Sequence, residues 1–347
     1  MSSEYRHVAM GYSSHHRMTL WPEIGLWLLA IAFLTAWVGG SGVRAGEAAP
    51  DPHSPEGSMR PVGQVLPTPT PDWGAIVTPL AQPAPASGMP FAPANTVPFA
   101  REGLVGSGTD GTLRRVTIPV LMYHYISVPP GDADVYRRDL SVTPDDFRAQ
   151  MRFLAEHDYS VVSLYDVNLA LRWGAPLPPN PVVLTFDDGY QDAYAAAYPI
   201  LQEFGVTGTF FVITARLDEG HPDYLTWAQA REMALAGMDI ESHTKDHVNL
   251  QGRDWDFLYY EVQGSIESIE AHTGFRSRMF CYPAGRWDES VLAVLEELGV
   301  WLAVTTEGGI DHTTDQMLLL RRVRVSGDAD LGTFAALLHW DWDRAES

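Results

Sequence analysis

Residues 182–213 read VVLTFDDGYQDAYAAAYPILQEFGVTGTFFVI, and this stretch contains one complete strand–helix–strand unit. The apolar run of residues 182–186 predicts a buried strand, and residues 208–213 predict a second one. Between them, the alanine-rich residues 192–204 predict a helix. Strands that alternate with helices are typical of βαβ units, in which the two strands run parallel.

The same alternation continues on both sides of this unit. Thr143 is a suitable N-cap for a helix, because Pro144 fits the first turn and Asp145 and Asp146 follow it. The other expected helices span residues 227–235, 257–272 and 288–299. The other expected strands span residues 118–123, 161–162, 238–241, 279–282 and 302–305. About seven such units in one domain predict a barrel, and in barrels the reactive residues lie at the carboxyl ends of strands.

Two adjacent carboxylates, Asp187 and Asp188, directly follow the expected strand of residues 182–186. Adjacent carboxylates in a cleft repel each other, so both ionise only where a cation or a hydrogen-bond donor lies nearby. A metal on one carboxylate and a proton-transfer role for the other would meet this requirement. The plainer interpretation is a turn, because Asp and Gly favour turns. The segment by itself leaves both interpretations open.

Two histidines, His243 and His247, follow the expected strand of residues 238–241 in the sequence SHTKDH. At a spacing of four, both imidazoles face one metal if the loop coils into a helical turn. An isolated pair at this spacing is usually incidental. If this histidine pair lies at the same barrel rim as Asp187 and Asp188, however, the combination predicts a metal site. One carboxylate and two imidazoles leave open positions for water and substrate, as in catalytic sites.

Three weaker signals also follow apolar runs. Residues 281–285 read CYPAG, a turn that would aim backbone N–H groups at a developing oxyanion. His124 ends the first expected strand, where a lone histidine is usually structural. Residues 318–325 read LLLRRVRV, and one of their arginines is expected to enter the barrel mouth. Because side chains alternate along a strand, Arg322 and Arg324 are expected on one face of it and Arg321 on the other.

The net charge and the cysteine count exclude several kinds of partner and any intramolecular disulfide. The formal net charge is -21, which argues against a nucleic-acid partner and against docking on anionic lipid through a basic patch. A neutral substrate, or one that gains positive charge on reaction, is electrostatically favoured. Cys281 is the single cysteine, so an intramolecular disulfide is excluded and stability must come from packing or metal.

The N-terminal third of the chain has a different composition. Residues 24–38, IGLWLLAIAFLTAWV, are shorter than a comfortable membrane span but suit the apolar region of a signal peptide. We therefore expect residues 1–45 to be a signal peptide or an N-terminal membrane anchor, and the protein to be extracytoplasmic. Residues 46–115 hold about half of the 25 prolines and predict a disordered, extended linker. The catalytic domain is expected at residues 116–342.

The motifs TFDDG, SHTKDH and YPAG, in this order and at strand ends, resemble those of the polysaccharide deacetylases, the NodB-like domains of carbohydrate esterase family 4. The resemblance covers about residues 116–336. It implies a distorted (β/α)7 TIM-like barrel with one divalent metal, commonly zinc, with Co2+ and Ni2+ as alternatives. It implies hydrolysis of an acetyl group by a water that the metal activates. It also implies a role for each matching residue: Asp187 as general base, Asp188, His243 and His247 as metal ligands, and Tyr282, Pro283 and Ala284 as the substrate-binding turn.

The chain departs from the usual family pattern in its third motif. Most members have Arg-x-Pro-Tyr where this chain has Cys281-Tyr282-Pro283-Ala284, so that arginine is absent. The opening VLMYHYI, the YPAG variant and the late RRV segment resemble the branch that deacetylates poly-N-acetylglucosamine. By that resemblance His124 is the general acid. Arg322 is the candidate that replaces the lost arginine and holds Asp187 ionised. His339 lies in what reads as a closing helix and is not expected to be catalytic.

The leading hypothesis is therefore removal of N-acetyl groups from an N-acetylglucosamine polysaccharide, either an exopolysaccharide or a cell-wall glycan. Two alternatives stay open at this point: an O-acetyl esterase on xylan, and an inactive carbohydrate-binding domain. Aromatic residues in or beside the motifs are candidates either for stacking on sugar rings or for ordinary packing. They are Tyr123, Tyr125, Tyr190, Tyr282 and Trp287.

Overall fold

The computed structural model describes residues 109–339. The expected signal or anchor segment, residues 1–45, and all but the end of the expected linker, residues 46–115, lie outside these described residues. The end of that linker already belongs to the domain, because β1 (Arg115–Thr117) pairs with β11 (Asp311–Thr313). No helix within residues 109–339 has the length and the apolar character needed to cross a membrane.

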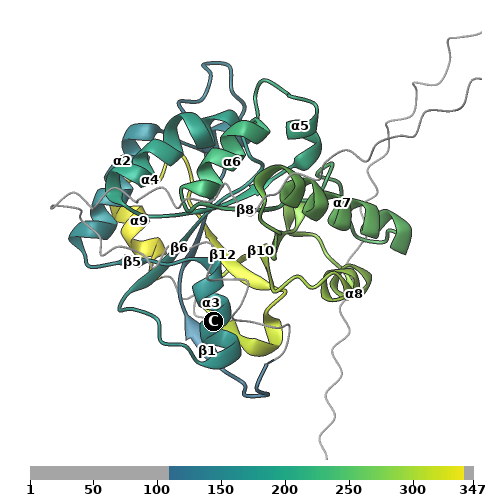
Figure 1. Cartoon of the computed structure of the whole chain (residues 1–347). Helices are drawn as coiled ribbons and strands as arrows, with labels where there is room; N and C mark the ends of the chain where they lie inside the picture. Colours follow the sequence, from purple (N-terminus) through teal and green to yellow (C-terminus); the bar gives the residue numbers. More distant parts are fainter. Residues whose placement is uncertain (1–108, 340–347) are drawn as a thin grey trace, which may run out of the picture. The chain divides into compact units, whose positions relative to one another are not determined.

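Seven parallel strands of the described chain close into a barrel (Figure 1). In order around the barrel they are β2 (Val120–Tyr123), β12 (Leu320–Arg324), β10 (Leu302–Gly308), β9 (Met279–Cys281), β8 (Asp239–Ser242), β7 (Thr209–Val212) and β6 (Pro181–Phe186). The barrel closes where β6 pairs with β2, from Val120 opposite Val183 to Tyr123 opposite Phe186. The predicted distorted (β/α)7 barrel is confirmed.

Besides the pairing of β1 with β11, two further short pairings lie outside this ring. Strand β5 (Ser160–Val161) pairs with β6 and extends the sheet there. Strands β3 (Tyr125–Ile126) and β4 (Ser141–Val142) form a separate two-stranded sheet. Because β3 follows β2 after a single residue, this small sheet begins at the carboxyl end of the barrel.

Helices pack around the strands, with α2, α4 and α6 over one part of the barrel and α7 and α8 beside another (Figure 1). The longer helices are α2 (Pro144–Glu156), α3 (Leu164–Trp173), α4 (Tyr198–Phe204), α6 (Trp227–Leu235), α7 (Trp255–Thr273), α8 (Glu289–Glu297) and α9 (Leu331–Leu337). Two shorter ones are α1 (Val135–Asp139) and α5 (Thr214–Asp218). Thr143 caps α2 as predicted, since its hydroxyl accepts a hydrogen bond from the Asp146 N–H.

The helical segments differ from the sequence-based expectation in two ways. Helix α3 was not predicted, although Ser163 and Asp166 form a capping box at its start, and neither were the short helices α1 and α5. The single helix expected over residues 192–204 is divided into a π-helix, η3 (Ala193–Ala197), followed by α4. Short π-helical segments are rare and occur frequently at functional sites.

A cluster of stacked aromatic rings supports the end of the barrel that carries the predicted site. The Phe186 ring lies 4.6 Å from Phe210 and 5.3 Å from Tyr123, measured between ring centroids. Phe147 meets Tyr123 edge to face at 5.2 Å. Tyr123 and Phe186 immediately precede His124 and Asp187, so the packing of these rings holds the backbone on which two predicted catalytic residues depend.

The seam between β8 and β9 is closed mainly by a side chain. The two strands share one register pair, Ser242 opposite Phe280. Beside it, the buried Glu241 carboxylate accepts hydrogen bonds from the backbone N–H groups of Arg278 and Met279, both at 2.9 Å, and from the Ser277 hydroxyl. Glu241 therefore replaces missing ladder bonds, which explains an acidic residue on a buried strand.

Candidate metal and catalytic site

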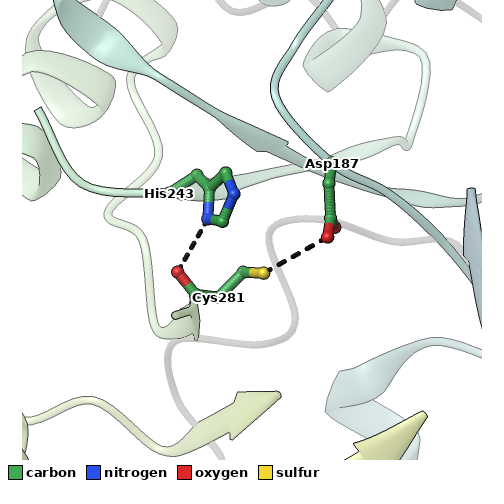
Figure 2. Close-up of side chains that lie close together, drawn as sticks. All are labelled: Asp187, His243 and Cys281. Atoms are coloured by element: carbon green, nitrogen blue, oxygen red, sulfur yellow. Dashed lines mark hydrogen bonds between the residues drawn. The ribbon is translucent and has the colours of Figure 1, made fainter. Parts of the chain in front are cut away.

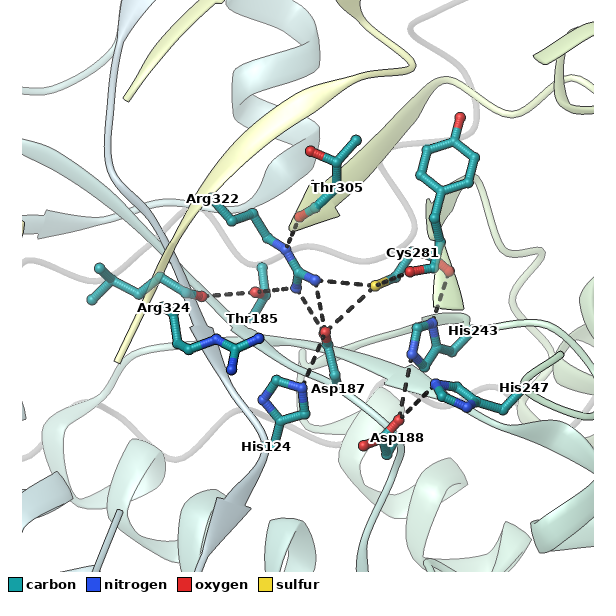
Figure 3. Close-up of polar contacts among 12 residues, drawn as sticks. His124, Thr185, Asp187, Asp188, His243, His247, Cys281, Thr305, Arg322 and Arg324 are labelled. Carbon is teal, nitrogen blue, oxygen red and sulfur yellow. Dashed lines mark hydrogen bonds and ion pairs between the residues drawn. The ribbon is translucent and has the colours of Figure 1, made fainter. Parts of the chain in front are cut away.

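The reactive side chains gather at the carboxyl ends of the barrel strands, as predicted for a barrel (Figure 3). Asp187 and Asp188 follow β6, His243 follows β8 and His124 follows β2. Bonds between neighbouring strands hold this rim together, since the Asp187 N–H donates to the Tyr123 carbonyl at 2.9 Å. Residues far apart in the chain thus meet on one surface.

Two residues of this rim, Asp188 and His243, converge with His247 on one point. Asp188, His243 and His247 bring one candidate ligand atom each within 4.8 Å of one another. The Asp188 Oδ1 lies 3.4 Å from Nε2 of His243 and 3.4 Å from Nε2 of His247. The His243 side chain is buried, whereas the His247 side chain is 39% exposed. The cluster therefore has one open side, toward solvent.

The backbone brings the two imidazoles together by a different route from the one expected. The loop does not form a helical turn; Thr244 and His247 instead adopt left-handed backbone angles, with φ of 65° and 55°. Asp188 is also left-handed, with φ of 72°. Such angles are uncommon for residues other than glycine and recur at functional sites, where the surrounding structure must hold them.

The hydrogen bonds of His243 suit a metal ligand. Its Nδ1 lies 2.7 Å from the Cys281 carbonyl oxygen. Since a carbonyl only accepts, Nδ1 carries a proton, and Nε2 is the nitrogen that faces Asp188 and would ligate a metal. One carboxylate and two imidazoles form a donor set that fits zinc and neighbouring divalent metals. The residues present therefore fit the metal that the motifs predict.

Asp187 forms a buried ion pair with Arg322 of β12. Arg322 Nη1 donates to Asp187 Oδ1 and Nη2 donates to Oδ2, each at 2.7 Å, and the Asp187 side chain is 3% exposed. Burial alone would raise the pKa of Asp187, but the charge and hydrogen bonds of Arg322 outweigh it and hold that pKa below its ordinary value. The carboxylate is therefore ionised at neutral pH.

Every guanidinium N–H group of Arg322 has an acceptor. Besides the two bonds to Asp187, Nε donates to the Thr305 carbonyl at 2.8 Å and Nη1 to the Thr185 hydroxyl at 3.1 Å. Nη2 also lies 3.2 Å from the Cys281 Sγ. A buried guanidinium with all its donors satisfied has one orientation available, so Arg322 fixes the position of Asp187 as well as its charge. Thr185, Thr305 and the Cys281 thiol were not predicted as parts of the site.

Cys281 lies between His243 and Asp187 (Figure 2). Its Sγ is 3.5 Å from Asp187 Oδ2, and burial raises the pKa of the thiol. Asp187, His243 and Cys281 also have the spacing of a metal-binding group. Arg322 contacts both Asp187 oxygens and the sulfur, however, so a cation there would meet a fixed positive charge. The cluster with Asp188 and His247 is therefore the better metal site.

His124 lies on the other side of Asp187. Its Nε2 is 3.9 Å from Asp187 Oδ2, and its side chain is 14% exposed. Burial lowers the pKa of His124, and the attraction of Asp187 and Asp188 only partly offsets this effect. The imidazole is thus neutral at neutral pH. The negative charge of Asp187 stabilises the imidazolium form whenever His124 takes up a proton.

The predicted substrate-binding turn is only partly placed for that role. Tyr282 is fully buried in the core, and its hydroxyl donates to the Leu318 carbonyl at 2.8 Å, so its ring is not available to a sugar. Pro283 is buried as well. Ala284 is exposed with a left-handed φ of 53°, and its N–H has no hydrogen-bond partner within residues 109–339. The backbone at Ala284 is the part of this turn that can face a ligand.

Among the remaining aromatic candidates, Trp287 is partly buried and packs against the core. Tyr123 is fully buried and donates to Gln150, so it belongs to the core. Tyr125 and Tyr190 stack on each other at 3.8 Å beside the site. His339 lies after α9, where its Nε2 is 2.8 Å from the Tyr159 hydroxyl, and it takes no part in the cluster.

We expect His247→Ala to weaken metal binding on the order of 100-fold or more, because losing an outer partner of a metal ligand already costs 10–100-fold. His247 is the most exposed of the three residues, so the fold should tolerate its removal. The measurement is the metal retained by the full chain after dialysis against buffers of known free Zn2+. His157→Ala, at the end of α2 and outside the cluster, is the matched control. Unchanged metal retention by His247→Ala would contradict the assignment.

Comparison with known proteins gives a consistent set of matches. A family profile described as "Polysaccharide deacetylase" matches residues 174–303. "Putative polysaccharide deacetylase YxkH" of Bacillus subtilis (strain 168) is 34% identical over 227 residues, which cover 65% of this chain and 78% of that protein. Poly-beta-1,6-N-acetyl-D-glucosamine N-deacetylase of Escherichia coli (strain K12) is 26% identical over 240 residues, 57% of this chain. The chain spans only 36% of that enzyme.

A solved structure agrees with this match at the level of the fold. The Streptococcus pyogenes deacetylase PplD, solved in complex with acetate, superposes with a TM-score of 0.60 and 29% sequence identity. The superposition covers 65% of this chain and 99% of the solved chain of the relative. The shared part is thus nearly all of that solved chain.

Proposed function

The chain belongs to the polysaccharide deacetylase family, and from this membership and the site geometry we propose that it is a metal-dependent hydrolase that removes N-acetyl groups from the N-acetylglucosamine units of a polysaccharide. The observation that carries the proposal is the convergence of Asp188, His243 and His247 beside an ionised Asp187. An inactive domain of the same fold would be expected to lack one of these groups. All four are present.

The protein supplies the base and its positioning. A divalent cation held by the three ligands, Zn2+ or alternatively Co2+ or Ni2+, would supply a Lewis acid that polarises an amide carbonyl and lowers the pKa of a water. Asp187 stands next to the ligand Asp188 and takes the proton from the attacking water. Arg322 keeps Asp187 ionised between turnovers and prevents its rotation.

The leaving nitrogen needs a proton before the carbon–nitrogen bond breaks. Neutral His124 lies 3.9 Å from Asp187 Oδ2, so a proton taken up by Asp187 has a short path to the imidazole. His124 then donates it to the leaving amine, and both residues return to their starting states. The Ala284 N–H, which has no hydrogen-bond partner among the described residues, is the candidate donor to the developing oxyanion.

The substrate assignment rests on two observations. The Escherichia coli relative is named for activity on poly-beta-1,6-N-acetyl-D-glucosamine. The net charge of -21 favours a polymer that is neutral before reaction and gains positive amines afterwards. We also propose an extracytoplasmic location, with residues 1–45 as a signal or a membrane tether. The apolar segment of residues 24–38 supports it.

The test is an assay of products with the full chain. N-acetylglucosamine oligomers of β-1,4 and β-1,6 linkage, and acetylated xylan, are each incubated with enzyme, with and without chelator. We expect acetate and free amino groups in equal amounts from at least one oligomer, loss of both with chelator, and recovery on adding Zn2+. Acetate from xylan alone, without amines, would identify an O-acetyl esterase instead. No acetate from any glycan with metal present would refute hydrolysis of glycan acetyl groups.

A further inference from the structure

The loop of residues 243–247, here called the ligand loop, carries two of the three candidate metal ligands and has no regular secondary structure. Its left-handed angles at Thr244 and His247 are of a kind that persists only where surrounding groups hold the chain. An internal bond contributes, from the His247 N–H to the Thr244 hydroxyl at 2.9 Å. The bonds between this loop and its neighbours therefore decide where the two imidazoles lie.

Helices on both sides supply those bonds. The carbonyls of Thr244 and Lys245 accept hydrogen bonds from the first residues of α5, at 3.3 and 2.9 Å. The N–H groups of Lys245 and Asp246 instead donate to the Glu261 carboxylate of α7, at 3.2 and 3.0 Å. Both of these bonds end on the same oxygen, Oε2. Successive backbone N–H groups in a turn form an anion-binding concavity, and here the anion is a side chain of the protein itself.

The Glu261 carboxylate is buried, because the residue is only 1% exposed. Burial of a carboxylate is costly unless hydrogen bonds offset the cost. No lysine or arginine among the described residues forms an ion pair with Glu261, and the nearby Lys245 Nζ lies 3.3 Å from Asp218 instead. The two N–H groups of the ligand loop therefore account for a carboxylate at this position, and an ion pair does not.

A second contact joins the same face of α7 to the start of the ligand loop. Ser265 follows Glu261 by four residues, so the two side chains lie on one face of the helix. The Ser265 Oγ lies 2.6 Å from the Oγ of Ser242, the residue before His243. Glu261 likewise binds the N–H of the residue before His247. One face of α7 thus holds the chain immediately ahead of both imidazoles and sets the distance between them.

We propose that Glu261 is a positioning residue of the metal centre, which holds the ligand loop so that the His247 imidazole meets Asp188 and His243. The inference rests on the proposed function only through the assignment of these three ligands. Without the carboxylate, the loop would move among several positions in the metal-free protein. A cation would then have to order the loop as it binds, and the cost of this ordering would lower its affinity.

The test compares metal affinity in the metal-free full chain as wild type, Glu261→Leu and Glu261→Gln. Zn2+ affinity is measured by competition with a chelating dye. Glu261→Leu removes the acceptor at a similar side-chain volume and should weaken Zn2+ binding about 10–100-fold, the usual effect of losing an outer partner of a metal ligand. Glu261→Gln should keep most of the affinity, because both bonds end on one oxygen and an amide oxygen can accept two.

A matched control separates this role from ordinary support of the fold. Asp254 caps the same helix, where its carboxylate accepts a hydrogen bond from the Phe257 N–H at 2.9 Å. Asp254→Ala should therefore destabilise α7 but leave the Zn2+ affinity of the folded protein unchanged. Hydrogen exchange of residues 243–247 in the metal-free protein is the second measurement. It should become faster in Glu261→Leu and stay near the wild-type rate in Glu261→Gln and Asp254→Ala.

The outcomes distinguish this inference from the proposed function. Wild-type Zn2+ affinity of folded Glu261→Leu would overturn the inference and leave the proposed function intact. Equal weakening by Glu261→Gln and Glu261→Leu would overturn the role given to the shared oxygen, and equal weakening by Asp254→Ala would reduce Glu261 to general support of the helix. Weaker Zn2+ binding by Glu261→Leu alone, in a protein that releases no acetate from any glycan, would support the inference and contradict the proposed function. A wild-type chain that binds no Zn2+ would refute the ligand assignment on which both depend.

Discussion

Asp187→Asn should lower the rate of acetate release by about 10²–10⁴-fold, the usual contribution of a general base. An asparagine amide occupies nearly the same space but accepts no proton at neutral pH. The ligands Asp188, His243 and His247 are untouched, so bound metal should stay near the wild-type amount. The measurement is kcat for the best oligomer together with metal content of the same sample.

The lower rate of acetate release has to be separated from any loss of folded protein. Asparagine leaves the Arg322 charge without its counter-charge, so the variant should also be less stable. Circular dichroism at the assay temperature gives the folded fraction, and the rate is expressed per folded molecule. Near-normal turnover by folded Asp187→Asn would mean that another residue is the base.

Arg322→Met should lower the free energy of unfolding by about 3–5 kcal/mol, the usual cost of removing one partner from a buried ion pair. The Asp187 side chain is 3% exposed and would lose both of its 2.7 Å charge-assisted hydrogen bonds. Without the guanidinium, burial would dominate and the pKa of Asp187 would rise, so fewer molecules would hold an ionised base. Urea unfolding of the metal-free protein measures the loss without a contribution from metal binding.

Arg324→Met is the matched control on the same strand. Its side chain is 46% exposed and pairs with Asp139 at 3.2 Å. Because solvent screens such a surface pair, its removal should lower the free energy of unfolding by no more than about 1 kcal/mol. The double variant Asp187→Asn with Arg322→Met should recover part of the stability lost by Arg322→Met, because no uncompensated charge is left. Equal losses for Arg322→Met and Arg324→Met would contradict a dominant role for the buried pair.

Local patterns predicted the parts of the fold that depend on local physics. Apolar runs located β6, β7, β8 and β9 within one or two residues, and the Thr143 cap was read correctly. Residues 227–235 matched α6 at both ends. The strands follow from the burial of apolar side chains at regular spacing, and the cap follows from the need of the first N–H groups of a helix for hydrogen-bond acceptors. Both depend on residues that are close together in the sequence.

Other features depend on contacts that a local pattern does not contain. The loop between His243 and His247 does not coil into the helical turn that would bring both imidazoles to one metal; left-handed angles at Thr244 and His247, maintained by the surrounding structure, bring them together instead. The Tyr282 ring was a candidate either for stacking on a sugar or for ordinary packing, and it packs in the core and bonds to Leu318. Each half of such a contact comes from a different part of the chain.

The sequence by itself determined that reactive residues stand at the ends of barrel strands, because the alternation of strands and helices sets which end of each strand they occupy. The motifs at those ends predicted a metal site, and their resemblance to the polysaccharide deacetylases implied which residues are the ligands and which carboxylate is the base. Only the tertiary structure decided what surrounds them: the five donors of Arg322 directed at Asp187, Thr185, Thr305 and Cys281, and the bonds of Glu261 to the ligand loop. The physical reason is that closing the barrel places β12 next to β2, and β2 next to β6. A charge on one strand thereby sets the pKa of a carboxylate far away in the chain.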